Sequence, residues 1–404
     1  MTTKLLRLTF CIGIFFACPS LLLAQEQLAG LYKLATSESP PTVYDRIQEQ
    51  GEPQSFYFEG ARYRGKATRI FAYYDIPLGT GPFPAIVLVH GGGGSAYKEW
   101  VKKWNDAGFA AISIAVEGQT ATGTGKRPPE KWVKHRWGGP RRPGIYNDAE
   151  QPLTDQWMYH ATSAVISAHN LLRSFKAIKK HQIGVTGISW GGVITSTVIG
   201  FDQRFAFAIP IYGCGYLNGM DNHYKKALKD NANYRDVWEP ALRIARYEGP
   251  TFWLTGLKEN NFALDAQAKT YQLLKGEHRH SIQPKLRHSH KAGWTPRESY
   301  VFAQSVINGQ ALPSFHNQNI SRNKAHVEVI DTNEIASASL IYTFDLGFTG
   351  KRTWHQGAVK MTESEEKMTL SASLPVKATA WFFNIEEDGL IYSSAFSERA
   401  SGNR

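Results

Sequence analysis

Strand-like and helix-like segments alternate along most of this 404-residue chain, and this alternation limits its fold more than any other feature. The strand-like runs are apolar, and they lie at residues 68–77, 83–90, 109–118, 181–189, 205–213 and 250–256. Helical spacing occurs at residues 96–108, 154–175 and 190–200, with Thr154 or Asp155 placed to cap the second of these helices. Continuous apolar strands that alternate with helices are typical of a parallel sheet covered on both faces. The pattern therefore predicts an α/β fold with a mostly parallel central sheet.

The pattern changes near residue 317. From there the chain shows short apolar runs such as "AHVEVI", "ASLIYTF" and "ATAWFFNIEE", and no helix-period stretch separates them. Such runs predict a small antiparallel β domain resembling a sandwich. We expect a main domain over residues 25–316 and a C-terminal β domain over residues 317–404.

The first 24 residues have the pattern of a secretory signal peptide. Lys4 and Arg7 precede an apolar stretch, and Ala24 is a small residue at a plausible cleavage point. Cleavage there predicts an exported protein, periplasmic or extracellular; a lipid anchor at Cys18 is the alternative. No later segment is long and apolar enough for a membrane helix, so stable membrane insertion is not expected. Cys214 is then the one cysteine of the mature chain, which excludes an internal disulfide.

The chain is basic, with a formal charge of +11 that falls to +9 when Lys4 and Arg7 leave with the signal. This balance either favours an anionic partner, such as acidic polysaccharide or a membrane surface, or only aids solubility. No nucleic-acid-binding motif is present, so a nucleic-acid partner is not expected.

The stretch "GISWGG" contains the pattern G-x-S-x-G between an apolar strand and a helix. A serine in that position is held on a tight, strained turn at the end of the strand, which exposes its hydroxyl as a nucleophile. Gly187 and Gly191 keep the turn small, and the N–H of Trp190 is aimed at a developing oxyanion. Ser189 is therefore the candidate nucleophile, although a glycine-rich strand-to-helix turn without chemistry can look the same.

A second glycine-rich turn, "HGGGG", follows the strand at residues 83–89. It fits the oxyanion loop of serine hydrolases, and Gly91 and Gly92 are the candidate donors. A phosphate-binding loop is the alternative, but the G-K-[ST] ending of such loops is missing. The two turns in this order predict a serine hydrolase.

A serine nucleophile needs a base and an acid, which in this fold follow the serine in the order acid, then histidine. Glu259, three residues past the strand that ends at Gly256, is the first choice for the acid, and Asp265 is the second. The base is expected after one more strand, where His288 and His290 lie. We expect His290 to be the base, because the small Ser289 lets the loop turn inward, and His288 is the alternative.

Four histidines between residues 278 and 290 also raise the possibility of a metal site. No carboxylate or cysteine pattern accompanies them, and His278 and His280 belong to the strand, so no metal site is predicted. No cofactor is expected either.

Two irregular stretches, at residues 118–152 and 215–248, follow strands of the predicted sheet. Ligands of such folds bind beyond the strand ends, so these stretches are candidate substrate-facing insertions. Trp132, Trp137 and Tyr216 in or beside them could stack on sugar rings or could serve as packing anchors.

These motifs resemble those of dienelactone hydrolase and acetylxylan esterase-like α/β-hydrolases of secreted bacterial polysaccharide-degradation systems. The resemblance covers about residues 55–315 and rests on segments such as "HGGGGSAYKEWVKKWNDAGFAAISI", "GVTGISWGG", "GLKENNF" and "HSHKAGWTPRESYVFAQSV". It implies an α/β-hydrolase fold and a triad of Ser189, Glu259 and one of the two histidines, where relatives usually carry Asp in place of Glu259.

The sequence thus predicts an exported serine esterase that hydrolyses acyl, especially acetyl, esters on polysaccharides or oligosaccharides. One alternative is a peptidase of the prolyl-oligopeptidase type, but the repeats of a propeller gate are missing from the sequence. A second alternative is a catalytically idle carbohydrate-binding or scaffold protein, for which an intact set of serine, acid and histidine has no use. The sequence does not determine the oligomeric state.

Overall fold

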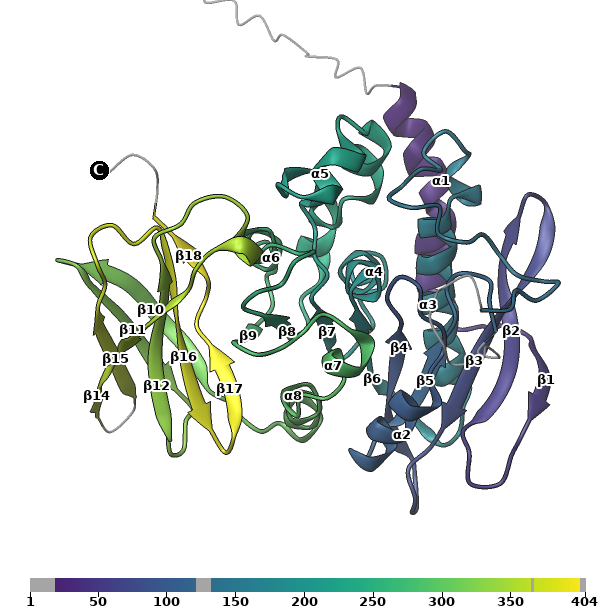
Figure 1. Ribbon diagram of the computed structural model, residues 1–404. Coiled ribbons are helices and arrows are strands. Elements are labelled where there is room, and N and C mark those ends of the chain that lie inside the picture. Colours follow the sequence, from purple (N-terminus) through teal and green to yellow (C-terminus); the bar gives the residue numbers. More distant parts are fainter. Residues whose placement is uncertain (1–18, 121–131, 365–366, 400–404) are drawn as a thin grey trace, which may run out of the picture.

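The computed structural model describes residues 19–120, 132–364 and 367–399. Its central sheet has the order β1-β2-β3-β5-β4-β6-β7-β8-β9, and the strands from β5 to β9 are parallel (Figure 1). The strands are β1 (Val43–Ile47), β2 (Gln54–Tyr63), β3 (Lys66–Asp75), β4 (Phe83–Val89), β5 (Ala110–Ile114), β6 (Ile178–Ile188), β7 (Ala208–Ile211), β8 (Thr251–Gly256) and β9 (His278–Gln283). The predicted α/β fold with a mostly parallel sheet is confirmed.

Helices cover both faces of this sheet, as right-handed crossovers between parallel strands require. Helix α2 connects β4 to β5, toward one edge of the sheet, and α3 connects β5 to β6, toward the other edge. Because both crossovers are right-handed, these two helices lie on opposite faces of the sheet (Figure 1). The helices are α1 (Pro19–Ala35), α2 (Lys98–Asp106), α3 (Trp157–Ser174), α4 (Trp190–Val198), α5 (His223–Leu228), α6 (Leu264–Tyr271), α7 (His290–Gly293) and α8 (Glu298–Asn308). Most residues of strands β4 to β8 are buried between the helices, which explains their apolar runs; the exceptions include the exposed Lys179, Lys180 and His181 near the start of β6.

The start of α3 differs from the prediction. The helix begins at Trp157, and neither Thr154 nor Asp155 caps it; both lie in a short 3-10 turn before it. The carboxylate of Asp148 instead accepts the Trp157 N–H at 2.7 Å. Asp155 accepts the N–H of Arg64 in the β2–β3 turn at 2.9 Å.

Helix α1 packs along α3 and spans the predicted cleavage point after Ala24. Leu28, Leu31 and Ala35 on its later part are buried, so a chain cut at Ala24 would keep this packing. The predicted signal peptide at residues 1–24 lies largely outside the described residues and stays a prediction.

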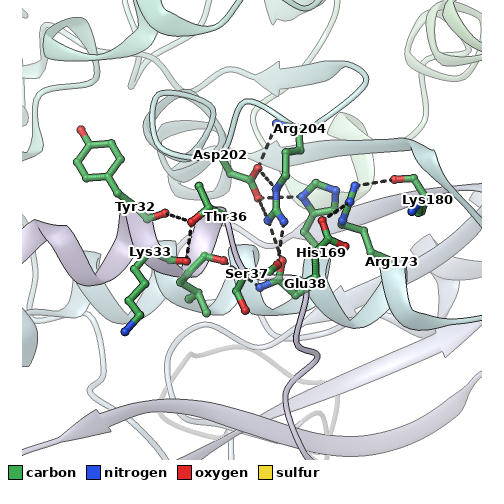
Figure 2. Close-up of polar contacts among 12 residues, drawn as sticks. Tyr32, Lys33, Thr36, Ser37, Glu38, His169, Arg173, Lys180, Asp202 and Arg204 are labelled. Carbon is green, nitrogen blue, oxygen red and sulfur yellow. Dashed lines mark hydrogen bonds and ion pairs between the residues drawn. The ribbon is translucent and has the colours of Figure 1, made fainter.

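A polar network fixes the segment that follows α1 (Figure 2). The Arg204 guanidinium donates to Asp202 at 2.8 Å and to the Ser37 carbonyl at 3.0 Å, and Asp202 also contacts the His169 ring at 2.9 Å. Burial disfavours the Asp202 carboxylate, but hydrogen bonds from Arg204 and His169 outweigh it and lower its pKa to about 2. The ion pair between Glu38 and Arg173 adds a second tie, at 2.7 Å.

The C-terminal part forms two facing antiparallel sheets, as predicted (Figure 1). One sheet has the order β10-β11-β15-β14, and the other contains β13, β12, β16, β17 and β18. The strands are β10 (Ser314–Ser321), β11 (Lys324–Ile330), β12 (Ser337–Thr343), β13 (His355–Ala358), β14 (Lys360–Glu363), β15 (Met368–Ser373), β16 (Ala380–Glu387), β17 (Leu390–Ser393) and β18 (Ser397–Glu398). Strand β17 pairs with β9 at Ser393 and His280, so the second sheet continues the central sheet of the main domain.

Two predictions from cysteine content and hydropathy can be compared with the structure. Cys214 is buried and unpaired. Among the described residues no helix has the length and apolar character needed to cross a membrane.

Candidate active site

Ser189 lies on the sharp turn between β6 and α4. Its backbone has φ of 60° and ψ of −117°, a strained conformation for a residue with a side chain, and such strain is typical of functional sites. The turn leaves no room at its glycines: a Cβ on Gly187 would lie 2.1 Å from the Gly191 carbonyl oxygen, and one on Gly191 would lie 2.0 Å from the Val89 oxygen. These two glycines therefore allow β4, β6 and α4 to meet beneath the Ser189 hydroxyl.

The structure places His288, and not His290, between the serine and the acid. The Nε2 atom of His288 lies 3.0 Å from Ser189 Oγ, and its Nδ1 atom lies 2.8 Å from Glu259 Oε2. An ionised carboxylate only accepts hydrogen bonds, so Nδ1 carries the proton and Nε2 offers its lone pair to the serine hydroxyl. The structure therefore gives the alternative, His288, the position required of the base, and it places His290, the expected base, at the N–H of Gly91 instead.

Glu259 has the position predicted for the acid. Its side chain is buried, and Oε1 accepts the N–H of Asn261 at 2.7 Å while Oε2 contacts His288. Asp265, the alternative, lies in α6 and pairs with Lys269 at 3.3 Å on the same helix. Of the two carboxylates, therefore, Glu259 contacts the imidazole of His288, whereas Asp265 contacts Lys269.

Two aromatic residues that the sequence analysis missed hold the His288 ring. The Tyr212 ring centroid lies 4.7 Å from that of His288, and the Phe262 ring stacks at 6.2 Å. The Tyr212 hydroxyl donates to the Arg287 carbonyl at 2.8 Å, and burial raises its pKa well above the usual range, which keeps it a donor. The position of Tyr212 directly after β7 was the sequence signal that could have indicated this role.

His290 contacts the oxyanion loop instead of the serine. Its Nε2 atom accepts the N–H of Gly91 at 2.8 Å, and its ring packs 5.1 Å from the Tyr97 ring. This hydrogen bond uses the Gly91 N–H, so Gly91 is not a free donor as predicted. Gly92 and Trp190 are the predicted donors that remain for an oxyanion beside Ser189.

Other side chains fix the conformation of the oxyanion loop. His90 is buried; its Nδ1 contacts the Gly91 carbonyl at 2.7 Å and its Nε2 accepts the Val116 N–H at 3.0 Å. Burial lowers the pKa of His90 to about 4, so the ring is neutral at ordinary pH and the Nδ1–H is the donor. The loop is therefore held by uncharged hydrogen bonds on one side and by His290 on the other.

The aromatic residues predicted to contact substrate have different surroundings. The Trp132 indole N–H donates to the Gly93 carbonyl at 2.9 Å, so this side chain supports the oxyanion loop. Trp137 packs against the guanidinium groups of Arg69 and Arg136, each 3.9 Å from its ring centroid. Tyr216 is partly buried, and its N–H donates to the Glu239 carboxylate at 2.9 Å. All three have packing or anchoring contacts, and a contact with sugar stays a prediction.

The described residues contain no group of three or more His, Cys, Asp or Glu side chains that could hold a metal ion. His278 and His280 lie in β9, as expected, and their rings pack against the ring of Tyr271.

The serine turn, the oxyanion loop and the sheet order define the class: this chain is an α/β-hydrolase. Residues 44–243 match the family model described as Acetyl xylan esterase (AXE1). The match includes the oxyanion loop and Ser189 and ends before Glu259 and His288. The family match covers just under half of the chain, and together with the fold it supports a carboxylic ester hydrolase.

Two solved structures support the fold. The acetyl xylan esterase from Paenibacillus sp. R4 is 16% identical with a TM-score of 0.54, over 71% of this chain and 94% of that chain. Acetyl xylan esterase 1 from Thermoanaerobacterium sp. JW/SL YS485 is 16% identical with a TM-score of 0.52, over 72% of this chain and 99% of that chain. None of the curated proteins compared matches this sequence.

Proposed function

We propose that this protein is a serine esterase that removes acyl groups, chiefly acetyl groups, from polysaccharides or oligosaccharides. The observation that carries the proposal is the position of His288, which contacts Ser189 Oγ at 3.0 Å and Glu259 Oε2 at 2.8 Å. A base must lie within hydrogen-bond reach of the proton that it removes, and both contacts meet that requirement.

In the proposed reaction Ser189 Oγ attacks the ester carbonyl carbon while its proton passes to Nε2 of His288. The negative charge that forms on the carbonyl oxygen is stabilised by the N–H groups of Gly92 and Trp190. His288 then gives the proton to the sugar oxygen as the carbon–oxygen bond breaks, which leaves an acyl-serine. Water, deprotonated by His288, attacks that ester; the carboxylic acid leaves and Ser189 regains its proton.

Glu259 orients the imidazole and stabilises the imidazolium that forms in both steps. Its burial keeps water from competing for Oε2, and the Asn261 N–H holds the other oxygen. The carboxylate does not need to accept the proton for this role.

The substrate class is supported by the family match and by the two similar structures, which are acetyl xylan esterases. The predicted signal peptide at residues 1–24 agrees with a polymeric substrate outside the cytoplasm. The proposed steps use side chains of this chain and water, so no cofactor is part of the proposal.

The test compares the wild type with Ser189→Ala on three substrates: p-nitrophenyl acetate, acetylated xylan and a peptide anilide. We expect release of nitrophenol and acetate by the wild type, little cleavage of the anilide, and a loss of at least about a thousandfold in kcat for Ser189→Ala. A serine-directed phosphonate should label Ser189 in the wild type.

Each alternative has its own signature in this test. Faster cleavage of the anilide than of either ester would favour a peptidase. No turnover of any substrate, with no phosphonate labelling, would favour an idle binding protein. Equal ester turnover by wild type and Ser189→Ala would overturn the serine mechanism.

A further inference from the structure

The loop that carries Glu259 is in direct contact with the C-terminal β domain. A short 3-10 turn between β12 and β13 (Thr349–Lys351) lies against this loop and against α6 (Figure 1). A Cβ on Gly350 would lie 2.0 Å from the Glu259 carbonyl oxygen and 2.9 Å from its carbonyl carbon. The contact is therefore between backbone and backbone, at the acid residue itself.

A hydrogen bond adjoins this contact. Thr349 is buried, and its hydroxyl oxygen accepts the N–H of Leu264 at 2.8 Å. Leu264 is the first residue of α6, where N–H groups lack a partner within the helix. Thr349 thus ties down the end of the acid loop, while Gly350 contacts its beginning.

The turn is itself fixed within the β domain. The Arg352 side chain donates from Nε to the Gly347 carbonyl at 2.9 Å and pairs with Glu398 of β18 at 2.7 Å. The Trp354 indole N–H points to the Thr349 carbonyl at 3.3 Å, and Phe348 is buried. Because the turn is fixed in this way, a shift of the β domain would also shift the residues that contact the acid loop.

The same domain supports the strand that leads to His288. The Ile282 N–H in β9 donates to the Ser393 hydroxyl at 2.7 Å, and the Asn384 amide donates to the Ile282 carbonyl at 3.0 Å. Both contacts are buried. The C-terminal β domain therefore contacts both the loop that carries Glu259 and the strand that leads to His288.

We propose that Thr349 and Gly350 of the C-terminal β domain are positioning residues that set the distance between Glu259 and His288. The inference rests on the proposed triad and goes beyond it, because it assigns the β domain a part in catalysis on every substrate, soluble or polymeric. A shift of the Glu259 backbone moves its carboxylate away from His288 Nδ1, and the imidazolium formed during the reaction then loses stabilisation.

Gly350→Ala is the direct test, because its added methyl group would overlap the Glu259 carbonyl and also come within 2.7 Å of the Phe348 ring, so the turn and the acid loop cannot keep their present contact. The matched control is Gly357→Ala in β13 of the same domain, where the new Cβ would meet its nearest neighbour, a Tyr342 ring atom, at an ordinary 3.6 Å. We expect Gly350→Ala to lose about ten- to a hundredfold in kcat on p-nitrophenyl acetate with KM little changed, as for other groups that support a catalytic residue. Gly357→Ala should stay within about twofold of the wild type, since its contact needs no shift.

The pH profile separates positioning from simple destabilisation. Because a more distant carboxylate stabilises the imidazolium less, the acid limb of the kcat/KM profile should move to lower pH in Gly350→Ala. Lower activity with an unchanged acid limb and a lowered melting temperature would overturn the positioning role. So would unchanged kcat in Gly350→Ala.

Thr349→Val and Thr349→Ser keep the proposal testable if Gly350→Ala does not fold. Valine has the shape of threonine but lacks the acceptor, and serine restores the acceptor. We expect lower kcat and the same pH shift in Thr349→Val, with recovery in Thr349→Ser; equal activity in both variants would overturn the role of the hydrogen bond.

Ser189→Ala distinguishes failure of this inference from failure of the proposed function. An inactive Ser189→Ala variant beside fully active Gly350→Ala and Thr349→Val variants overturns the positioning role and leaves the esterase mechanism intact. A fully active Ser189→Ala variant overturns both.

Discussion

Replacing His288 and His290 in turn tests the arrangement of the site most sharply, because the two histidines are two residues apart and contact different partners. His288→Ala removes the group that contacts both Ser189 Oγ and Glu259. We expect it to lose at least about a thousandfold in kcat, as severe as Ser189→Ala, because members of a catalytic unit fail together.

His290→Ala removes the acceptor of the Gly91 N–H, a hydrogen bond of 2.8 Å, and the ring that packs against Tyr97, but no contact with Ser189 Oγ or Glu259 that His288 makes. Leaving a buried N–H without a partner costs about 1–3 kcal/mol. If all of that cost falls on the oxyanion loop in the transition state, it corresponds to about a 5- to 150-fold loss in kcat, since each 1.36 kcal/mol is tenfold. His290→Ala should therefore be at least about sevenfold more active than His288→Ala, even at the upper end of this cost.

Glutamine at each position gives a matched control. Its amide group reaches about as far as Nε2 and can accept a hydrogen bond, but it cannot accept a proton at neutral pH. His290→Gln should recover much of the activity lost in His290→Ala, whereas His288→Gln should stay as inactive as His288→Ala. The assay is kcat on p-nitrophenyl acetate at the plateau of the pH profile, with melting temperatures to confirm that each variant is folded.

Two outcomes would refute this reasoning. A larger loss in His290→Ala than in His288→Ala would mean that His290 is the base in the working enzyme. Recovery by glutamine at position 288 would mean that this residue orients its neighbours without transferring a proton.

Further outcomes follow from the same contacts. Glu259→Gln should lower kcat by about a thousandfold or more, because it removes the carboxylate that fixes the tautomer of His288. Asp265→Asn should keep kcat within about twofold of the wild type, since it breaks only an ion pair at the helix surface. Measuring kcat of both variants on p-nitrophenyl acetate tests this difference. Burial lowers the pKa of His90 in the folded protein to about 4, so as pH falls below about 6.5 the unfolded chain binds the proton more readily than the folded one. This residue therefore contributes up to about 3 kcal/mol to the free energy of unfolding, and that contribution is lost as pH falls towards 4. Urea unfolding at pH 7 and pH 5 should show a lower free energy of unfolding at pH 5. Trp132→Phe should lower kcat by about fivefold, the equivalent of about 1 kcal/mol for its hydrogen bond to the oxyanion loop, with KM measured alongside. Truncation after residue 316 should give an insoluble or inactive chain, because it uncovers β9; a soluble and fully active fragment in a sedimentation and activity assay would contradict the shared sheet.

The sequence was sufficient for the features that arise within a single strand and its following turn. The patterns around Ser189, Gly92 and Glu259 each stand at the carboxyl end of an apolar strand, and parallel strands bring those ends to one edge of the sheet. The local sequence patterns and this rule for parallel strands were thus enough to predict that the candidate nucleophile, one candidate oxyanion donor and the candidate acid lie at the same edge of the sheet.

The choice between His288 and His290 could not be read from the sequence in the same way. Both lie in the loop after β9, and the small Ser289 suggested that the chain turns inward after it. The structure uses Ser289 differently: its hydroxyl accepts the Ala292 N–H at 3.0 Å and caps α7, so His290 starts a helix that faces Gly91. Tyr212, directly after β7, packs on the ring of His288, and its place at a strand end marks it as near the site without showing which histidine it contacts.

The link between the domains was hidden for the same reason. The pairing of β17 with β9 joins residues more than a hundred positions apart, and the short strands after residue 317 read equally well as an independent sandwich. The cap of α3 is a smaller example, since Asp148 accepts the N–H of Trp157 in place of the nearer Thr154 or Asp155 that the sequence favoured. Long-range partners decide such features, and a single sequence does not record them.

The presence of glutamate at the acid position has a physical consequence that ties these observations together. Relative to aspartate, Glu259 adds one carbon–carbon bond, about 1.5 Å, and one more rotatable angle between the backbone and the carboxylate. A longer arm needs firmer support if its oxygen is to stay 2.8 Å from His288 Nδ1. The structure provides that support at both ends: Asn261 donates to the carboxylate, and Gly350 of the β domain contacts the Glu259 carbonyl. The two contacts are therefore complementary: the N–H of Asn261 restrains the rotation of the longer side chain, and Gly350 of the β domain restrains the backbone from which that side chain extends.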